Sequence, residues 1–170
     1  IEAGRITVLP NQVQPAPHPQ RGPRANPDRF AYFGNIATHK GVLPLMAATR
    51  LAGEALTLDL HGGLGHAEAG FRREFAEALA ATPNAAHHGP YNCADLPALM
   101  ARADWLVLPS LWWENAPLVI YEALFHRRPV IAYPHGGAPE ILARHGGGLL
   151  AASSDPEAIA DRMQEIIAEP

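Results

Sequence analysis

The segment that best indicates the fold is Ala103-Asp104-Trp105-Leu106-Val107-Leu108-Pro109-Ser110. Its apolar centre predicts a buried strand, Trp105–Leu108, because short apolar runs bounded by turn residues are typical of strands that are covered on both faces. Pro109 and Ser110 predict a turn after the strand. Beyond a loop, the segment Pro117–His126 predicts a helix, so this part of the chain has the strand–loop–helix order of an α/β protein.

The same alternation extends from Phe30 to the end of the sequence. The predicted strands are Phe30–Gly34, Leu56–Leu60, Ala85–His88, Trp105–Leu108, Pro129–Ala132 and Gly148–Leu150. The predicted helices are Lys40–Leu51, Ala67–Ala81, Leu96–Ala101, Pro117–His126, Ala138–Ala143 and Pro156–Ala168. Strands that alternate with helices form βαβ units, so we expect an α/β fold with a doubly wound, mostly parallel six-stranded sheet and helices on both faces, as in Rossmann-like domains.

The length of 170 residues fits one domain with a substantial core. Residues 1–29 are expected to be an inter-domain strand, around Arg5–Leu9, followed by an exposed Pro-rich loop. Residues 30–170 are expected to form the ligand-binding domain. Because the sequence starts at Ile1 on a strand-like segment, we interpret it as a fragment of a longer protein.

Composition excludes several classes of partner. The 17 acidic and 13 basic residues give a net charge of −4, and no Lys/Arg-rich run indicates nucleic-acid binding. The single cysteine, Cys93, rules out intramolecular disulfides and fits a reducing compartment. No apolar run approaches the roughly 20 residues that a transmembrane helix needs. We therefore expect a cytoplasmic protein with no transmembrane segment in this part.

Two carboxylates, Glu114 and Glu122, lie on either side of the predicted start of the helix Pro117–His126. Glu114 is on the loop beyond the carboxyl end of a strand, where open α/β sheets bind ligands. Glu122 is inside the helix but near its start. The two acids therefore suit opposite ends of one ligand, although acids that merely favour a helix start are the plain alternative.

The start of this helix is also expected to hold a phosphate. Asn115 is a good N-cap and Pro117 suits the first turn. The free backbone N–H groups of Leu118 and Val119 would then face outward, and together with the helix dipole they favour an anion.

These residues resemble the E-x7-E pattern of the retaining glycosyltransferases of group 1 (family 4), which have the GT-B fold. The pattern is carried by Trp113–Leu124, and the segments that support it occur in family order: Tyr32–Gly41, Leu108–Ser110 and His135–Glu140. The resemblance covers roughly Ile6 to Ala168. It implies the carboxyl-terminal, donor-binding half of such an enzyme, with the amino-terminal acceptor domain missing from this chain.

The resemblance also implies roles for individual residues. Glu114 would contact the donor sugar, Glu122 the ribose of the nucleotide, and Lys40 the diphosphate, where an ammonium offsets the charge that develops on the leaving group. Glu114 and Lys40 are thus the implied catalytic residues. The donor-binding residues implied by the resemblance are Gly34, Asn35, Lys40, Gly62, Tyr91, Glu114, Asn115, Ala116, Pro117, Leu118, Val119 and Glu122.

Asn35 departs from the family pattern, which has an arginine at this position. An amide donates hydrogen bonds but carries no charge, so stabilisation of the leaving group is expected to be weaker, or another cation must supply it. Two alternatives to transfer stay open, the first because of the doubly wound architecture and the second because of Asn35. One is a sugar-nucleotide epimerase of similar architecture, and the other is a module that binds a nucleotide sugar without catalysis.

The segment Gly62-Gly63-Leu64-Gly65 invites comparison with dinucleotide-binding loops. No acidic residue follows about 20 positions later at a strand end, so a nicotinamide enzyme is disfavoured. The nine histidines do not predict a metal site either. His87 and His88 are adjacent in a strand and point to opposite faces. No metal-ligand spacing with Cys93 is shared by His39, His61, His66 and His135. The expected substrate is a nucleotide diphosphate sugar, with no metal and no cofactor.

Overall fold

The computed structural model describes residues 27–65 and 67–168. The strands are β1 (Arg29–Phe33), β2 (Thr57–His61), β3 (Ala85–Gly89), β4 (Trp105–Leu108), β5 (Val130–Ala132) and β6 (Gly148–Leu150). The helices are α1 (Val42–Ala52), α2 (Ala69–Ala80), α3 (Leu96–Met100), α4 (Leu118–Phe125), α5 (Ala138–His145) and α6 (Pro156–Ala168). All twelve predicted strands and helices are confirmed, with small shifts at their ends.

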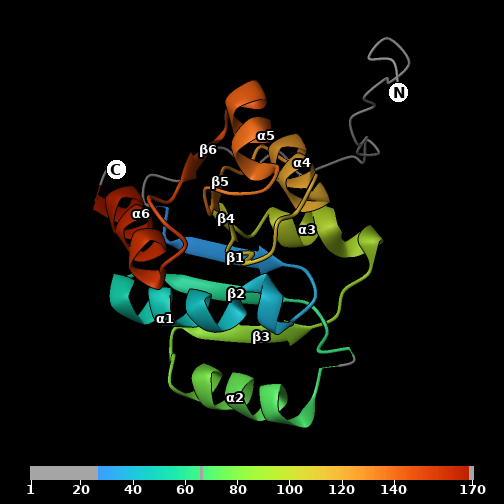
Figure 1. Cartoon of the computed structure of the whole chain (residues 1–170), viewed down its shortest axis with the longest axis vertical. Coiled ribbons are helices and arrows are strands. Elements are labelled where there is room, and N and C mark those ends of the chain that lie inside the picture. Colours follow the sequence, from blue (N-terminus) through green and yellow to red (C-terminus); the bar gives the residue numbers. More distant parts are fainter. Residues whose placement is uncertain (1–26, 66, 169–170) are drawn as a thin grey trace.

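The six strands form one sheet in the order β3-β2-β1-β4-β5-β6. Every neighbouring pair in this sheet is parallel. Figure 1 shows the strands stacked in this order, with α2 beyond the β3 edge. The strand order reverses between β1 and β4, which makes this the topological switch point, where doubly wound sheets bind ligands.

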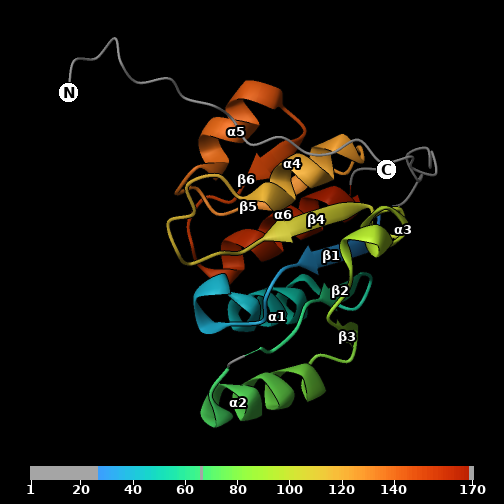
Figure 2. The same ribbon diagram turned by 90° about the vertical axis from the view of Figure 1, so that its right-hand side faces the viewer.

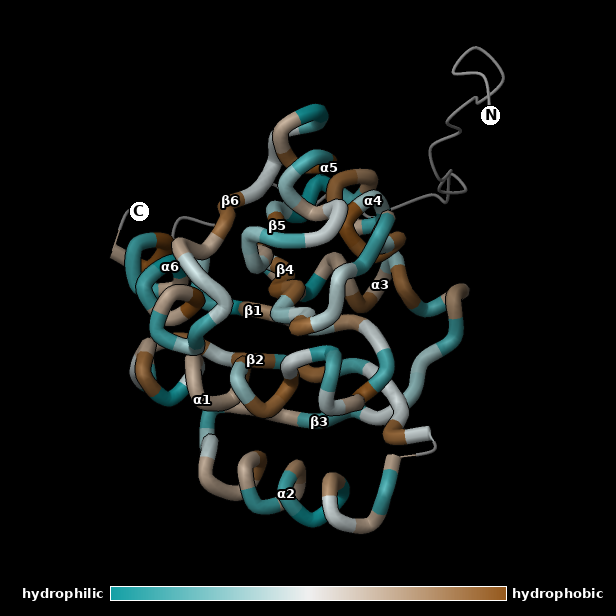
Figure 3. Tube along the Cα trace, in the orientation of Figure 1, coloured by the Kyte–Doolittle hydropathy of each residue, from teal (hydrophilic) through white to brown (hydrophobic). Residues whose placement is uncertain are grey.

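Helices cover both faces of the sheet, and each face has its own apolar core. One core joins α1, α2 and α6 to the sheet through residues such as Met46, Phe75 and Met163. The other joins α3, α4 and α5 to the opposite face through residues such as Met100 and Ile120. Figure 2 shows the sheet between these helical layers, and Figure 3 shows hydrophobic segments both in strands such as β4 and in the helices. The predicted α/β doubly wound fold is confirmed.

A buried carboxylate fixes the two strands at the switch point. Asp104, which immediately precedes β4, accepts backbone hydrogen bonds at Oδ2 from Asp28 (3.2 Å) and Arg29 (3.1 Å) at the start of β1. Its side chain is buried. Because a charged acceptor strengthens such bonds, this contact holds β1 and β4 in register at their amino ends and aligns the loops at their carboxyl ends.

The predicted strand Arg5–Leu9 and the Pro-rich loop lie outside the described residues, so the division at residue 29 stays a prediction. β1 itself begins at Arg29. None of the helices in the two described ranges has the length and apolar character that a bilayer-spanning segment requires.

Candidate functional site: the carboxyl edge at the switch point

The two loops at the switch point are joined by an ion pair. Lys40, on the loop after β1, places Nζ 2.5 Å from Oε1 of Glu114, on the loop after β4. The two side chains are 26% and 22% exposed. Ser110 donates a second hydrogen bond to the same carboxylate oxygen at 3.1 Å. The structure thus brings together the two residues that sequence reasoning singled out as catalytic.

Lys40 is held by a tight turn and not by the start of a helix, so the predicted helix start at Lys40 is wrong. Residues Thr38–Lys40 form a 3-10 turn, and α1 begins only at Val42. Gly41 separates the two with φ +71°, a conformation that side chains rarely adopt. A Cβ on Gly41 would lie 1.8 Å from the carbonyl oxygen of Pro109, so this glycine lets the two loops touch.

The loop after β5 packs against Glu114 from the other side. The N–H of Gly137 donates a hydrogen bond to the Glu114 carbonyl oxygen at 2.6 Å. A Cβ on Gly137 would lie 1.9 Å from the Asn115 carbonyl oxygen, and one on Gly136 would lie 2.6 Å from that of Glu114. The small-residue loop predicted from His135 to Glu140 therefore acts as a close support for the backbone that carries Glu114.

His135 ties the same loops together through its imidazole. Nε2 lies 2.7 Å from the Ser110 carbonyl oxygen, and Nδ1 lies 3.0 Å from the Ser154 hydroxyl. Because a carbonyl oxygen only accepts, Nε2 carries the hydrogen. Trp113, which is 72% exposed, lies beside this ring with a centroid separation of 5.6 Å. Sequence reasoning assigned no role to either side chain, although each is the first residue of a segment that carries the family resemblance.

Helix α4 begins at Leu118, one residue later than predicted. The N-cap is Pro117 and not Asn115, and no side chain caps the helix. Pro117 has ψ +111°, an extended conformation that a helical residue does not have, which moves the first helical residue to Leu118. The expected donors, Leu118 and Val119, are accordingly the first two residues of the helix, where backbone N–H groups have no intrahelical acceptor. Ala116 lies in the preceding loop.

Glu122 lies within α4, one turn from its start, and is half-buried. Burial raises the pKa of its carboxyl group above the ordinary value of 4.5. Burial also raises the pKa of Tyr91 to about 12, with a further contribution from the charge of Glu122. Tyr91 makes edge contacts with the ring of Phe33 at 5.6 Å and of His61 at 6.4 Å. An acid within α4 and an aromatic ring beyond the end of β3 thus lie close enough to interact.

The remaining predicted donor-binding residues lie on the loops after β1 and β2. The N–H of Gly34 donates to the His61 carbonyl oxygen at 3.0 Å, and a Cβ on Gly62 would lie 1.7 Å from the Gly34 carbonyl oxygen. Asn35 is exposed, and its carbonyl oxygen accepts a hydrogen bond from Tyr32 at 2.8 Å. A cavity of about 590 Å³ opens between these loops, lined in part by Asn35 and Thr38.

A group that sequence reasoning missed lies at the ends of β2 and β3. His88 pairs with Asp59 at 2.6 Å and stacks on His61. Burial, followed by the charge of His88, lowers the pKa of His61 to about 4, although Asp59 opposes this shift. The spacing Asp-x-His within a strand was a usable signal, but the position of His88 beside it depends on strand pairing that the local sequence does not encode.

The fold is similar to that of several solved structures. HepE from Anabaena, crystallised with UDP, superposes with a TM-score of 0.76 at 25% identity over 85% of this chain and 40% of HepE. A sucrose-phosphate synthase from Thermosynechococcus elongatus gives a TM-score of 0.73 at 27% identity over 86% of this chain and 38% of the synthase. The carboxyl-terminal domain of a group 1 glycosyl transferase from Francisella tularensis has the same fold, with a TM-score of 0.70 at 22% identity over 83% of this chain and 75% of that domain.

A curated relative matches a smaller part of the chain. It is an exopolysaccharide phosphotransferase of Streptomyces coelicolor, 36% identical over 70 residues, which make up 41% of this chain and 7% of the relative. The chain therefore spans a small part of this relative and about two fifths of HepE and the synthase.

The family comparison covers all of the described residues. The sequence model of the family described as "Glycosyl transferases group 1" matches residues 27–169. This range includes both loops at the switch point and all six strands. The chain belongs to the group 1 glycosyl transferases.

Proposed function

We propose that this chain is the donor-binding half of a retaining glycosyltransferase, which moves a sugar from a nucleoside diphosphate sugar to an acceptor held by another domain. The observation that carries the proposal is the contact between Lys40 and Glu114 across the switch point, next to the start of α4. It gathers a cation, a carboxylate and outward-facing N–H groups at the edge where such sheets bind ligands.

In this arrangement the nucleotide lies across α4. Glu122 accepts hydrogen bonds from the ribose hydroxyls, and Tyr91 lies beside it. The diphosphate occupies the start of α4, where the N–H groups of Leu118 and Val119 and the ammonium of Lys40 neutralise its charge. Glu114 accepts hydrogen bonds from the sugar.

The chemical step breaks the bond between the anomeric carbon and the diphosphate oxygen, and forms a bond from that carbon to an acceptor hydroxyl oxygen. Negative charge grows on the departing diphosphate, and its oxygen takes up the proton that the acceptor hydroxyl loses. Lys40 and the helix dipole oppose that charge, which is the form of electrostatic stabilisation that lowers barriers most. The proposed step needs no metal, because these groups supply the positive charge.

Asn35 gives one reason to keep a second candidate, a module that binds the donor without transferring its sugar. The exposed amide supplies no positive charge on the loop that carries Lys40. Membership of the glycosyl transferase family favours transfer over this candidate, and over the epimerase that the sequence left open.

The experiment uses the longer protein that contains this chain, incubated with a panel of nucleoside diphosphate sugars and a cell-envelope acceptor extract. Because HepE was crystallised with UDP, uridine diphosphate sugars head the panel. We expect release of nucleoside diphosphate that depends on acceptor, and NMR of the product should show the anomeric configuration of the donor. Glu114→Gln should abolish this release, whereas the control Glu77→Gln, an exposed acid of α2, should not.

Release without any sugar-transfer product would contradict transfer. Donor binding with no turnover would establish the binding module instead. A product with inverted configuration would overturn the retaining mechanism while leaving the donor site intact.

A further inference from the structure

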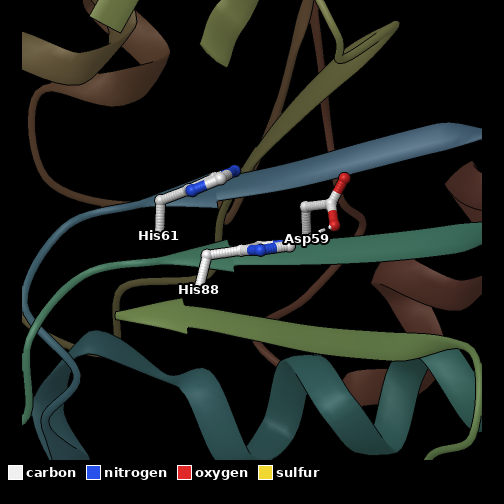
Figure 4. Close-up of side chains that lie close together, drawn as sticks. All are labelled: Asp59, His61 and His88. Atoms are coloured by element: carbon white, nitrogen blue, oxygen red, sulfur yellow. Dashed lines mark hydrogen bonds and ion pairs between the residues drawn. The ribbon is translucent and has the colours of Figure 1, made fainter. Parts of the chain in front are cut away.

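Three side chains with metal-binding atoms share one face of the sheet at the ends of β2 and β3. Asp59 and His61 are two positions apart in β2, so both point to the same face. Asp59 pairs with Ala86 of β3, and His88 lies two positions beyond Ala86 on the same face. Figure 4 shows the two imidazoles extending toward the Asp59 carboxylate.

The donor atoms of the three side chains are already close. One ligand atom from each lies within 4.8 Å of the others. The imidazole rings of His61 and His88 stack with centroids 4.7 Å apart and planes 17° apart. Bonds of about 2.0–2.2 Å in a tetrahedral site put ligand atoms roughly 3.3 Å from one another. Closing around an ion therefore requires a shift of at most about 1.5 Å.

Two of the ligands are free to make this shift. The side chains of His88 and Asp59 are 46% and 34% exposed, so rotation of either meets solvent on one side. His61, by contrast, is only 7% exposed and is held by Phe33, whose ring stacks on it at a centroid distance of 4.7 Å. The imidazole of His61 is therefore fixed, whereas the side chains of Asp59 and His88 can move toward it when an ion binds.

We propose that Asp59, His61 and His88 bind a divalent transition-metal ion of the zinc type. Two imidazoles and one carboxylate suit zinc, nickel or cobalt, whereas magnesium and calcium prefer sites made of oxygen ligands. Three protein ligands leave at least one position for water or an anionic ligand at the exposed side. This site goes beyond the proposed function, since sugar transfer as described above needs no metal.

The charges around the three ligands determine the expected affinity for the metal ion. The ion replaces the contact between His88 and Asp59, and the carboxylate charge favours a cation. Arg102 adds positive potential at His61, which works against tight binding. We therefore expect binding in the micromolar range, weaker than that of a closed structural zinc site.

The test is calorimetric titration of the protein, free of affinity tags and stripped by chelator, with ZnCl₂ at pH 7.5, followed by CoCl₂ and MgCl₂. We expect one equivalent of zinc to bind and magnesium not to compete. His88→Ala and Asp59→Asn should each weaken binding by at least about 10-fold, the lower end of the loss that follows when even outer-shell partners of a metal are removed.

The adjacent histidine in β3 provides a matched control. His87 points to the other face, where its Nε2 contacts the Gly62 carbonyl oxygen at 2.7 Å. His87→Ala should leave zinc affinity unchanged, and circular dichroism should show the fold of each variant intact. The absence of saturable zinc binding up to about 1 mM would overturn the proposal. Binding that survives both ligand substitutions, or that falls equally in the His87 control, would overturn it as well.

Discussion

Replacing Lys40 with Ala should weaken binding of a nucleoside diphosphate by about 10- to 150-fold and leave binding of the matching nucleoside almost unchanged. The prediction follows from one charge-assisted contact to the diphosphate, worth about 1.5–3 kcal/mol, at about 1.4 kcal/mol per tenfold change in affinity. A nucleoside lacks the diphosphate and therefore loses nothing.

The structure narrows this range. Lys40 is only 26% exposed, so its charge is shielded from water more than that of a surface lysine, whose ion pairs are worth about 0.2–1 kcal/mol. The ammonium of Lys40 already contacts the Glu114 carboxylate at 2.5 Å, so a diphosphate must compete with Glu114 for this contact. We therefore expect a loss in the lower half of the range. Glu114→Gln removes the competing charge and should strengthen diphosphate binding.

The assay is isothermal titration calorimetry with nucleoside and nucleoside diphosphate pairs in buffer that contains EDTA. Arg73→Ala is the control, because it removes one positive charge from a side chain of α2 that is 75% exposed. Lys40 is the single lysine of the sequence, so reductive methylation with labelled formaldehyde gives one lysine NMR signal that should shift when diphosphate binds.

Two results would refute this reasoning. Equal losses for nucleoside and diphosphate in the Lys40 variant would show that the residue supports the fold and not the phosphate. A loss of the same size in the Arg73 control would show that only the net charge of the domain matters.

Three further predictions concern the support of the site, its pH dependence and its completeness. Gly137→Ala should lower the free energy of unfolding, measured by urea denaturation, by more than about 1 kcal/mol, because its Cβ would lie 1.9 Å from the Asn115 carbonyl oxygen. The control Gly70→Ala in α2, which has open space around it, should be neutral or stabilising. Because burial raises the pKa of Glu122, its carboxylate is protonated at a higher pH than that of an ordinary glutamate. As the pH is lowered, nucleotide affinity measured by calorimetry should therefore already decrease before pH 4.5 is reached, and an affinity that stays constant down to pH 4.5 would contradict the ribose contact. A protein limited to these 170 residues should bind the donor but give no acceptor-dependent release of nucleoside diphosphate, since positioning both reactants supplies much of the rate. Release at the rate of the longer protein would show that this chain is catalytically complete.

Local patterns were enough to predict the order of strands and helices. The apolar run Trp105–Leu108 forms a strand whose last three residues are buried, as the sequence predicted. Glu114 lies on the loop beyond the carboxyl end of that strand, also as predicted. Helix ends were less accurate, because they depend on single backbone angles. Pro117 is extended and displaces the start of α4, and the left-handed Gly41 separates Lys40 from α1.

Contacts between distant segments could be predicted only through the resemblance to a family. The pairing of Lys40 with Glu114 spans 74 residues, and no local pattern encodes it. The group Asp59, His61 and His88 was missed because it depends on the register between β2 and β3, including the shift after Leu60. The contact between His135 and the Ser110 carbonyl oxygen was missed because it joins the loops after β5 and β4, which are 25 residues apart in the sequence.

The central claim is that α4 holds the nucleotide of a sugar donor through Glu122. The most direct measurement is the dissociation constant of the best nucleoside diphosphate, and of its nucleoside, for the unmodified protein, for Glu122→Gln and for the control Glu77→Gln, an exposed acid of α2. Because both ligands carry the ribose, Glu122→Gln should weaken both by about 10- to 150-fold, the loss of a hydrogen bond to a charged group, while the control binds as the unmodified protein does. If no nucleoside diphosphate binds the unmodified protein, or if the folded Glu122→Gln variant binds both ligands with unchanged affinity, the account of this site is wrong.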